Sequence, residues 1–480
     1  MQADLIMTNA MLLDGSGRDA TPGNLAIHDG IIVAVGDFPV PDGVPVLDAA
    51  GHALAPGFID SHTHDDGYLL VHPDMTPKVS QGITTVVTGN CGISLAPLVA
   101  DEIVQPLDLL GPQELFRYAS FADWLHALGT TPAAVNVIPL IGHTTLRAAV
   151  MDDLTQPANA AECARMSEIV EAAMQAGAFG VSTGTFYPPA AAATTQEIID
   201  VCAPLRGRQG IYATHLRDES DHIDAAIEEA LAIGAATQSR VVFSHHKLAG
   251  ENNHGRSSET LARITAASRD QPVCLDCHPY PATSTMLRLD RVKLASRTLV
   301  TWSKSYPEAA GRDFKDLMAE FGLDVEQTLQ KLTPAGAIYF LMSQQDVDRI
   351  IKHPLTMIGS DGLPFDPHPH PRQWGTFTQV LRRLVRESRL LALPEAIHKM
   401  TGLAAAQYGL TDRGLLQPGQ RADLVLFDPA TVADRATFSD PIQTSLGVMG
   451  VWVNGERVWD GEKATGARPG QVLRPAHRLA

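Results

Sequence analysis

The 480-residue sequence predicts an α/β fold: a (β/α)8 barrel of the TIM type with a small β-sandwich domain and a lid insertion. Three observations support this fold class. The middle of the chain alternates apolar strands with helical stretches, both ends are rich in short strands, and one interval between strands is too long for an ordinary loop. We expect residues 1–55 and 415–480 to form the β-sandwich domain and residues 56–414 the barrel, with the lid at about residues 283–350.

Eight apolar strands can be counted in the middle of the chain, which is the number that a (β/α)8 barrel needs. Amphipathic helices separate several of them, and two of these helices span residues 166–176 and 223–233. Gly177 and Gly234 follow these helices and are expected to cap their carboxyl ends. The expected strands end at Asp60, Thr88, Ile141, Ser182, His215, His245, His278 and Asp361.

Hairpins are predicted near both ends of the chain. Asp29-Gly30 and Asn454-Gly455 are dipeptides typical of tight turns, and apolar strands flank each of them. Because both ends are strand-rich around a different middle, we expect them to meet in one small β-sandwich.

The interval from Tyr280 to Leu355 separates the last two expected barrel strands. It contains two helical stretches, Asp313–Phe321 and Asp324–Leu332, within charged and irregular sequence. A loop of this length inside a compact domain is usually functional, so we interpret it as a lid over the mouth of the barrel.

Composition excludes several classes of protein. The formal net charge of −17 argues against a nucleic-acid partner, which requires clustered basic residues. We find no apolar run long enough for a membrane span and no signal peptide after Met1. The five cysteines are irregularly spaced, as expected of reduced thiols in a cytoplasmic protein.

The strongest local motif is Asp60-Ser61-His62-Thr63-His64, which follows a buried strand. In extended chain alternate side chains share a face, so His62 and His64 can point at one metal ion. Two polar loop histidines would be the ordinary interpretation elsewhere. Active sites of such barrels, however, lie at the carboxyl ends of the strands, where this motif falls.

Other metal-binding side chains fall at the same rim. His215 and His245 end two strands, Asp361 ends the last one, and Cys91 follows the strand that ends at Thr88. Each alone has an ordinary structural explanation, but together they place imidazole, thiolate and carboxylate ligands on one edge. These are zinc-type donors, and a catalytic zinc takes about three protein ligands and one open position.

The chain resembles the amidohydrolase superfamily and, within it, the D-aminoacylase (N-acyl-D-amino-acid deacylase) family, over essentially its whole length. The resemblance is most specific in residues 60–66, 88–92, 244–247 and 359–364. It implies a tight zinc site at Cys91, His215 and His245, where His245 rather than His246 is the ligand. It also implies a second, weaker metal site at His62, His64 and Asp361.

An absence supports this branch of the superfamily. Hydantoinases and related enzymes bridge two metals with a carbamylated lysine on the fourth strand, and residues 180–187 contain no lysine. The resemblance assigns the bridging role to Cys91 instead. A hydrolase of cyclic amides is accordingly the weaker alternative.

The implied reaction is hydrolysis of the amide bond of an N-acyl-D-amino acid by zinc-activated water. Asp361 is the expected general base and acid. By resemblance, the side chains that bind the substrate carboxylate are Lys247, Arg372, Tyr187 and Ser284. His278 stands where the family usually has tyrosine, which puts that contact in doubt.

Two classes of substrate remain open. An acidic D-glutamate or D-aspartate side chain needs a further cation, and the candidates at the start of the expected lid are Arg288, Arg291, Lys293 and Arg297. We interpret these four as solvated charges and expect neutral substrates, such as N-acetyl-D-methionine, D-leucine or D-phenylalanine derivatives. The acidic class is the alternative.

Two further motifs are interpreted as decoys. Residues 180–184 match the G-x-S-x-G pattern of serine hydrolases, but Tyr187-Pro188-Pro189 does not open the helix that the pattern requires. Residues 274–278 match C-x-x-C-H, a haem-attachment pattern, on an expected barrel strand. A serine hydrolase, or a relative that has lost catalysis, would be the rival function.

Overall fold

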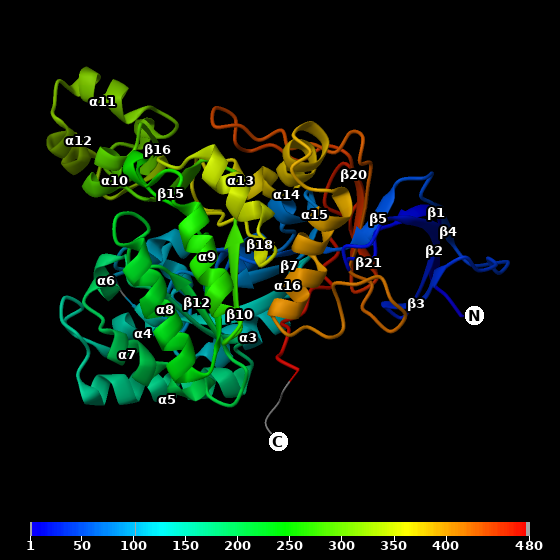
Figure 1. Cartoon of the computed structure of the whole chain (residues 1–480), viewed down its shortest axis with the longest axis horizontal. Coiled ribbons are helices and arrows are strands. Elements are labelled where there is room, and N and C mark those ends of the chain that lie inside the picture. The colour runs from blue at the N-terminus through cyan, green and yellow to red at the C-terminus, as the bar shows by residue number, and fades with distance from the viewer. Residues whose placement is uncertain (1, 101, 477–480) are drawn as a thin grey trace.

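The computed structural model describes residues 2–100 and 102–476, and its centre is a barrel of eight parallel strands (Figure 1). The backbone N–H of Ser61 donates to the carbonyl of Ile358, and Thr63 pairs in parallel with Gly362, so the first and last strands meet. The predicted barrel is therefore confirmed. In order around it, the strands are β6 (Phe58–Asp60), β7 (Ile83–Thr88), β10 (Asn136–Gly142), β11 (Gly180–Gly184), β12 (Ile211–His215), β13 (Arg240–Phe243), β14 (Val273–Cys277) and β18 (Thr356–Ile358).

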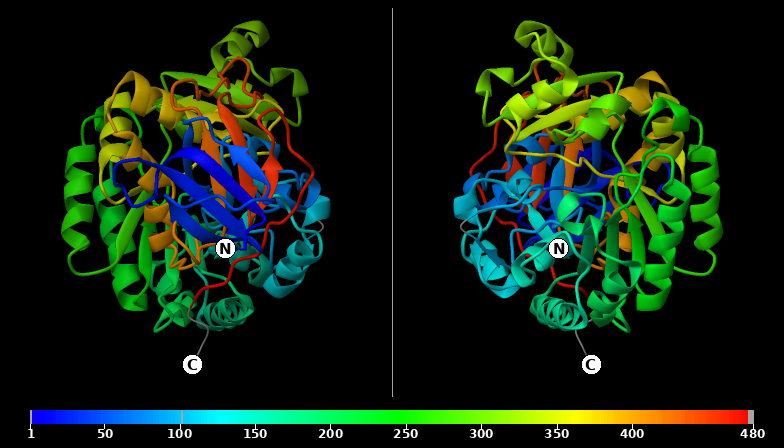
Figure 2. Two further views of the ribbon diagram at one scale, coloured as in Figure 1. Left: turned by 90° about the vertical axis from the view of Figure 1, so that its right-hand side faces the viewer. Right: turned by 90° about the vertical axis from the view of Figure 1, so that its left-hand side faces the viewer.

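Helices surround the barrel strands (Figure 2). Parallel strands covered on both faces are buried along their whole length, and every residue of β7, β10, β11, β12 and β14 is buried. The helices between and after the strands are α1 (Tyr68–Val71), α2 (Thr76–Val79), α3 (Phe121–Thr130), α4 (His143–Val150), α5 (Ala160–Ala176), α6 (Pro188–Ala191), α7 (Thr195–Val201), α8 (Ile223–Thr237), α9 (Ser257–Ala267), α13 (Gln344–Lys352), α14 (Arg372–Gln379), α15 (Leu393–Met400) and α16 (Gly402–Gln407).

Two helix ends differ in how well the sequence predicted them. Gly177 caps α5 as expected, although that helix begins six residues earlier, where Asn159 and Glu162 form a reciprocal capping box. The expected end of α8 at Gly234 is wrong, because the helix continues to Thr237. Gly234 serves packing instead: an added Cβ there would lie 2.2 Å from a methyl group of Val241 on β13. Among residues 2–100 and 102–476, no helix has the length and apolar character needed to cross a membrane.

The two ends of the chain meet in one mixed sheet beside the barrel (Figure 1). The junction is the antiparallel pair of β5 and β19, in which Ala55 lies opposite Val425. Both expected hairpins are present within this sheet. Its strands are β1 (Leu5–Leu12), β2 (Thr21–His28), β3 (Ile31–Gly36), β4 (Val46–Asp48), β5 (Ala53–Pro56), β19 (Leu424–Phe427), β20 (Val448–Val453) and β21 (Glu456–Trp459).

The insertion before the last barrel strand folds as a unit at one end of the barrel (Figure 2). Its core is a three-stranded antiparallel sheet in the order β15-β17-β16. The insertion ends at Phe340, because the following helix α13 packs against α9, β14 and β18 of the barrel. Its elements are β15 (Ala282–Met286), α10 (Leu289–Leu294), β16 (Arg297–Ser303), α11 (Phe314–Phe321), α12 (Val325–Leu332) and β17 (Ala335–Phe340).

Candidate metal centre and substrate pocket

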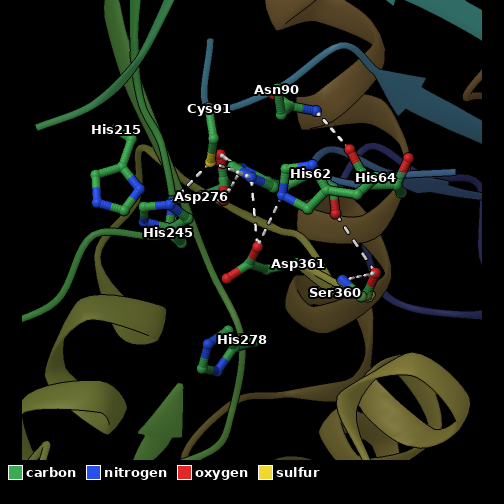
Figure 3. A network of polar contacts seen from close by, with 12 residues as sticks. His62, His64, Asn90, Cys91, His215, His245, Asp276, His278, Ser360 and Asp361 are labelled. Atoms are coloured by element: carbon green, nitrogen blue, oxygen red, sulfur yellow. Dashed lines mark hydrogen bonds and ion pairs between the residues drawn. The ribbon is translucent and has the colours of Figure 1, made fainter. Parts of the chain in front are cut away.

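All six side chains expected to bind metal lie together at the carboxyl ends of the barrel strands (Figure 3). Each is supplied by the end of a strand or by the residues that follow it, and all are buried. They are His62 and His64 after β6, Cys91 after β7, His215 on β12, His245 after β13 and Asp361 after β18.

Within this cluster Cys91 belongs to two groups of potential ligands. Its Sγ lies 3.2 Å from Nε2 of His245 and 3.3 Å from Nε2 of His62. One group contains Cys91, His215 and His245, and the other contains Cys91, His62, His64 and Asp361; the ligand atoms in each lie within 4.8 Å of one another. A shared thiolate between two such groups is the arrangement of a bridging ligand.

The neighbouring histidine, His246, points away from the cluster. Its Nε2 lies 2.9 Å from the hydroxyl of Thr260 on α9. The geometry therefore agrees with His245, rather than His246, as the histidine of this strand that faces the centre.

Unsatisfied polar atoms support a metal ion in the cluster. Both ring nitrogens of His215 and Nδ1 of His64 are buried without a hydrogen-bond partner among the described residues. Buried polar groups are nearly always paired, so orphaned imidazole nitrogens beside a thiol and a carboxylate fit zinc ligands.

Burial holds His62, His215 and His245 in the neutral form that binds metal. Burial lowers the pKa of His62 to about 3. Burial also lowers the pKa of His245, with a further contribution from the Lys247 charge, and it places that of His215 well below its usual range. Neutral imidazole offers a lone pair to a cation, whereas imidazolium does not.

Asp361 is ionised and tied to Arg372. Nη1 of Arg372 lies 2.7 Å from Oδ2 of Asp361, and Oδ1 of the same carboxylate lies 3.3 Å from Nε2 of His64. Burial alone would raise the pKa of Asp361, but the Arg372 guanidinium and the neighbouring histidines hold it well below its usual range. One oxygen of the carboxylate thus faces the metal group while the other faces an arginine.

Three of the five residues expected to bind substrate cluster on one side of Asp361. Fully buried Arg372 contacts Nε2 of His278 through Nη1 at 3.2 Å and donates to the carbonyl of Ser284 through Nη2 at 3.1 Å. Nε of Arg372 has no hydrogen-bond partner among the described residues. One donor of the guanidinium is therefore unpaired within this set of residues.

The other two expected binding residues lie across the pocket. The hydroxyl of Tyr187 lies 3.1 Å from that of Thr285 on the insertion. Nζ of Lys247 lies 2.5 Å from Oε1 of Glu219 and 2.6 Å from Nδ1 of His245. Lys247 is thus already engaged by an ion pair, which the sequence did not indicate.

A small cavity separates these groups and is closed by the insertion. Its volume is about 20 Å³, which holds roughly one water molecule. The walls are formed by His64, Leu109, Phe186, Tyr187, His215, Glu219, His245, Lys247, Thr283, Ser284, Thr285, Arg291, Asp361 and Leu363.

Sequence reasoning missed two carboxylates that support the cluster. Glu219 faces Lys247, His215 and His245. Oδ1 of Asp276 accepts the backbone N–H of His245 at 2.8 Å. Oδ1 of Asp276 also lies 3.2 Å from Nδ1 of His62. The only available sequence indication was position, since Glu219 follows His215 by four residues and Asp276 lies on a barrel strand.

The sequence also misjudged Arg291. It is 5% exposed and lines the cavity, rather than being a solvated charge. Its guanidinium lies 4.2 Å from the centre of the Phe186 ring, and Phe186 in turn stacks on His215. Nε of Arg291 lies 3.8 Å from a carboxylate oxygen of Asp290.

Both decoy motifs are structural. Ser182 lies within β11, accepts the backbone N–H of Gly92 at 2.9 Å and donates to the carbonyl of Gly89, so it is no exposed nucleophile. Cys274 and Cys277 are buried, free cysteines of β14.

Comparison with known proteins agrees with this geometry. The model of the amidohydrolase family matches residues 45–459. The chain belongs to the amidohydrolase family. It is 72% identical to N-acyl-D-aspartate deacylase of Alcaligenes xylosoxydans xylosoxydans over 479 residues, covering 100% of this chain and 96% of the relative.

Solved structures place this amidohydrolase among the D-aminoacylases. A D-aminoacylase with a binuclear metal centre superimposes with a TM-score of 0.97 at 52% identity, covering 98% of this chain and 100% of that one. N-acyl-D-glutamate deacylase from Bordetella bronchiseptica, complexed with zinc and a phosphonate mimic of the tetrahedral intermediate, gives 0.95 at 43% identity, covering 99% and 100%. The protein is accordingly a metal-dependent amidohydrolase that deacylates N-acyl-D-amino acids.

Proposed function

We propose that this amidohydrolase is a zinc enzyme that prefers N-acyl-D-aspartate and releases D-aspartate and a carboxylate. The observation that carries the substrate preference is Arg291, a buried cation in the wall of the pocket. The 72% identical relative, which is named for N-acyl-D-aspartate, supports the same choice.

Charge complementarity favours an acidic substrate over a neutral one. Lys247 is paired with Glu219 and Arg372 with Asp361. Within the described part of the chain, the ion-pair partner of Arg291 is Asp290 at 3.8 Å, and its guanidinium also lies over the ring of Phe186. A buried charge is stabilised when a partner neutralises it. The side-chain carboxylate of the substrate supplies that partner, which a methionine or leucine side chain does not.

The α-carboxylate of the substrate is assigned to the opposite side of the pocket. Lys247, Tyr187 and Ser284 line the cavity, and Arg372 donates to the carbonyl of Ser284 and has an Nε without a partner among the described residues. His278 contacts Arg372 from behind, so it orients the guanidinium. A planar guanidinium fixes a carboxylate with directional hydrogen bonds, which a lysine does not.

Hydrolysis requires a nucleophile and two proton transfers, one from the attacking water and one to the leaving nitrogen. Cys91, His215 and His245 would hold a zinc ion, and His62, His64 and Asp361 would hold a second, weaker one; zinc bound there would acidify water and polarise the acyl carbonyl. Asp361 accepts a proton from the attacking water as its oxygen bonds to the acyl carbon. The same carboxyl group then returns that proton to the nitrogen as the carbon–nitrogen bond breaks.

The test compares N-acetyl-D-aspartate, N-acetyl-D-glutamate, N-acetyl-D-methionine and the L-enantiomer of the first. One preparation of known zinc content is assayed as isolated, after chelation and after zinc is restored. We expect zinc-dependent turnover with the largest kcat/KM for N-acetyl-D-aspartate and none for the L-form. A larger kcat/KM for N-acetyl-D-methionine would contradict the acidic preference, and turnover that survives removal of zinc would contradict the metal assignment.

A further inference from the structure

Glu219 occupies a position that the reaction described above leaves unexplained. It lies just beyond β12, and its carboxylate is 5% exposed. Oε1 lies 2.5 Å from Nζ of Lys247 and 3.2 Å from Nδ1 of His245, while Oε2 lies 3.6 Å from Nε2 of His215. One buried carboxylate therefore contacts two histidines of the tight metal group and the cation next to them.

The His245 ring shows what this contact does. Its Nε2 faces Sγ of Cys91 at 3.2 Å (Figure 3). Its Nδ1 is the nitrogen that lies 3.2 Å from Oε1 of Glu219. A neutral imidazole that offers the Nε2 lone pair to a metal carries its proton on Nδ1. A carboxylate is the acceptor that fixes this tautomer and ring orientation.

The position of Lys247 explains why a carboxylate, that of Glu219, lies beside His245. An ammonium group only donates, so it cannot accept a hydrogen bond from a protonated Nδ1. Yet Nζ of Lys247 lies 2.6 Å from Nδ1 of His245. Oε1 of Glu219 lies within reach of both Nδ1 of His245 and Nζ of Lys247. Its negative charge offsets the unfavourable approach of these two hydrogen-bond donors.

We propose that Glu219 is a positioning residue that links the tight metal site to the substrate-binding cation. Its carboxylate fixes His245 for metal binding and holds Lys247 where the α-carboxylate of the substrate docks. The effect on the metal stands on the geometry alone, whereas the effect on the substrate rests on the proposed function.

The first measurement is zinc affinity in the absence of substrate. Glu219→Gln is titrated against a chelator of known affinity, and bound zinc is quantified. We expect zinc to bind 10- to 100-fold more weakly, as is usual when a carboxylate that supports a ligating histidine is lost. The matched control is Glu197→Gln: Glu197 is another buried carboxylate, paired with Arg147 and His143 away from the cluster. That variant should keep wild-type zinc affinity.

The second measurement separates positioning from a general loss of stability. At saturating zinc, Glu219→Gln should raise KM for the N-acyl-D-amino acid more than it lowers kcat, and Glu219→Asp should recover part of both zinc affinity and KM. Zinc affinity in Glu219→Gln equal to that of the wild type, or lowered equally in Glu197→Gln, would overturn the proposal. Weakened zinc binding with no deacylase activity in any variant, wild type included, would instead refute the proposed function while leaving the metal role of Glu219 supported.

Discussion

Three residues of the metal cluster hold a backbone conformation that costs free energy. Cys91, His245 and Asp361 have φ angles of 53°, 35° and 51°, in the left-handed region. Residues other than glycine rarely adopt it, and such strain concentrates at functional sites. All three follow the end of a barrel strand, where the chain turns sharply and presents the side chain over the mouth of the barrel.

At this scale the first prediction concerns Asp361. Asp361→Asn should lower kcat by roughly 10²- to 10⁴-fold, because an amide cannot carry the proton from water to the leaving nitrogen. Zinc at Cys91, His215 and His245 should remain, and metal analysis of the same preparation checks this. Asp346→Asn is the control, since Asp346 is a buried carboxylate on α13 outside the cluster. Turnover within a few-fold of the wild type would contradict the role of Asp361.

The second prediction concerns Arg291. Arg291→Gln should reduce kcat/KM for N-acetyl-D-aspartate by about 10- to 100-fold more than for N-acetyl-D-methionine, since a charge-assisted hydrogen bond contributes about 1.5–3 kcal/mol. Arg297→Gln is the control, because Arg297 lies on the same insertion but is exposed and paired with Asp313. Equal losses of kcat/KM for the two substrates would show that Arg291 does not bind the side-chain carboxylate of the substrate.

Residue types at strand ends made most of this cluster predictable. His62, His64, Cys91, His215, His245 and Asp361 carry metal-binding atoms at positions that the strand count brings to one rim. Glu219 and Asp276 were not predictable, because a lone carboxylate becomes recognisable only through partners distant in sequence, such as Asp276 beside His62. Arg291 was misjudged for the same reason: its burial depends on how the insertion packs.

At the scale of elements, α8 shows where local rules fail. Glycine after a helical stretch commonly ends a helix, yet α8 runs through Gly234 to Gln238, which adopts the left-handed cap. Contact with β13 decides the outcome, since no side chain larger than hydrogen fits between Gly234 and Val241. The bounds of the insertion were misjudged similarly, because only packing reveals that α13 belongs to the barrel.

This packing gives the third prediction. Gly234→Ala should destabilise the protein by about 1–3 kcal/mol, because an added methyl group overpacks the contact with Val241 and outweighs the gain of about 1 kcal/mol in helix propensity. Gly129→Ala in α3, where nothing lies within 4 Å of an added Cβ, should be neutral or stabilising. Midpoints of thermal unfolding for the two variants check the contrast. A stabilised Gly234→Ala variant would contradict it.

At the scale of the whole molecule, the barrel and the terminal sheet were predictable from the order of elements. The particular strand pairs that join distant parts of the chain were not. Strand pairing across the chain, such as β5 with β19, joins residues about 370 positions apart, and no local pattern specifies it. The closed architecture also buries many titratable groups, so its stability depends on pH.

Buried histidines and buried carboxyl groups have opposite effects on how the stability of the fold changes with pH. Burial lowers the pKa values of His143 and His246, the latter to about 3. These groups stay neutral in the folded protein but take up protons when unfolded below about pH 6.5, so their contribution is present above that pH and is lost as the pH falls. Burial raises the pKa values of Asp276 and Asp366 to about 7, and these two carboxyl groups stabilise the fold as the pH falls.

The last prediction tests the contribution of one histidine, His143, to the pH dependence of stability. His143 is fully buried beside Glu197 and Arg147 and is not a member of the metal cluster. Between pH 7.5 and 5, His143→Gln should lose less thermal stability than the wild type, because glutamine has no proton to take up on unfolding. The difference approaches about 1.4 kcal/mol per pH unit below 6.5 for a group that stays neutral when folded. His126→Gln, at an exposed position of α3, should follow the wild type. Parallel curves for His143→Gln and the wild type would show that His143 contributes nothing to acid lability.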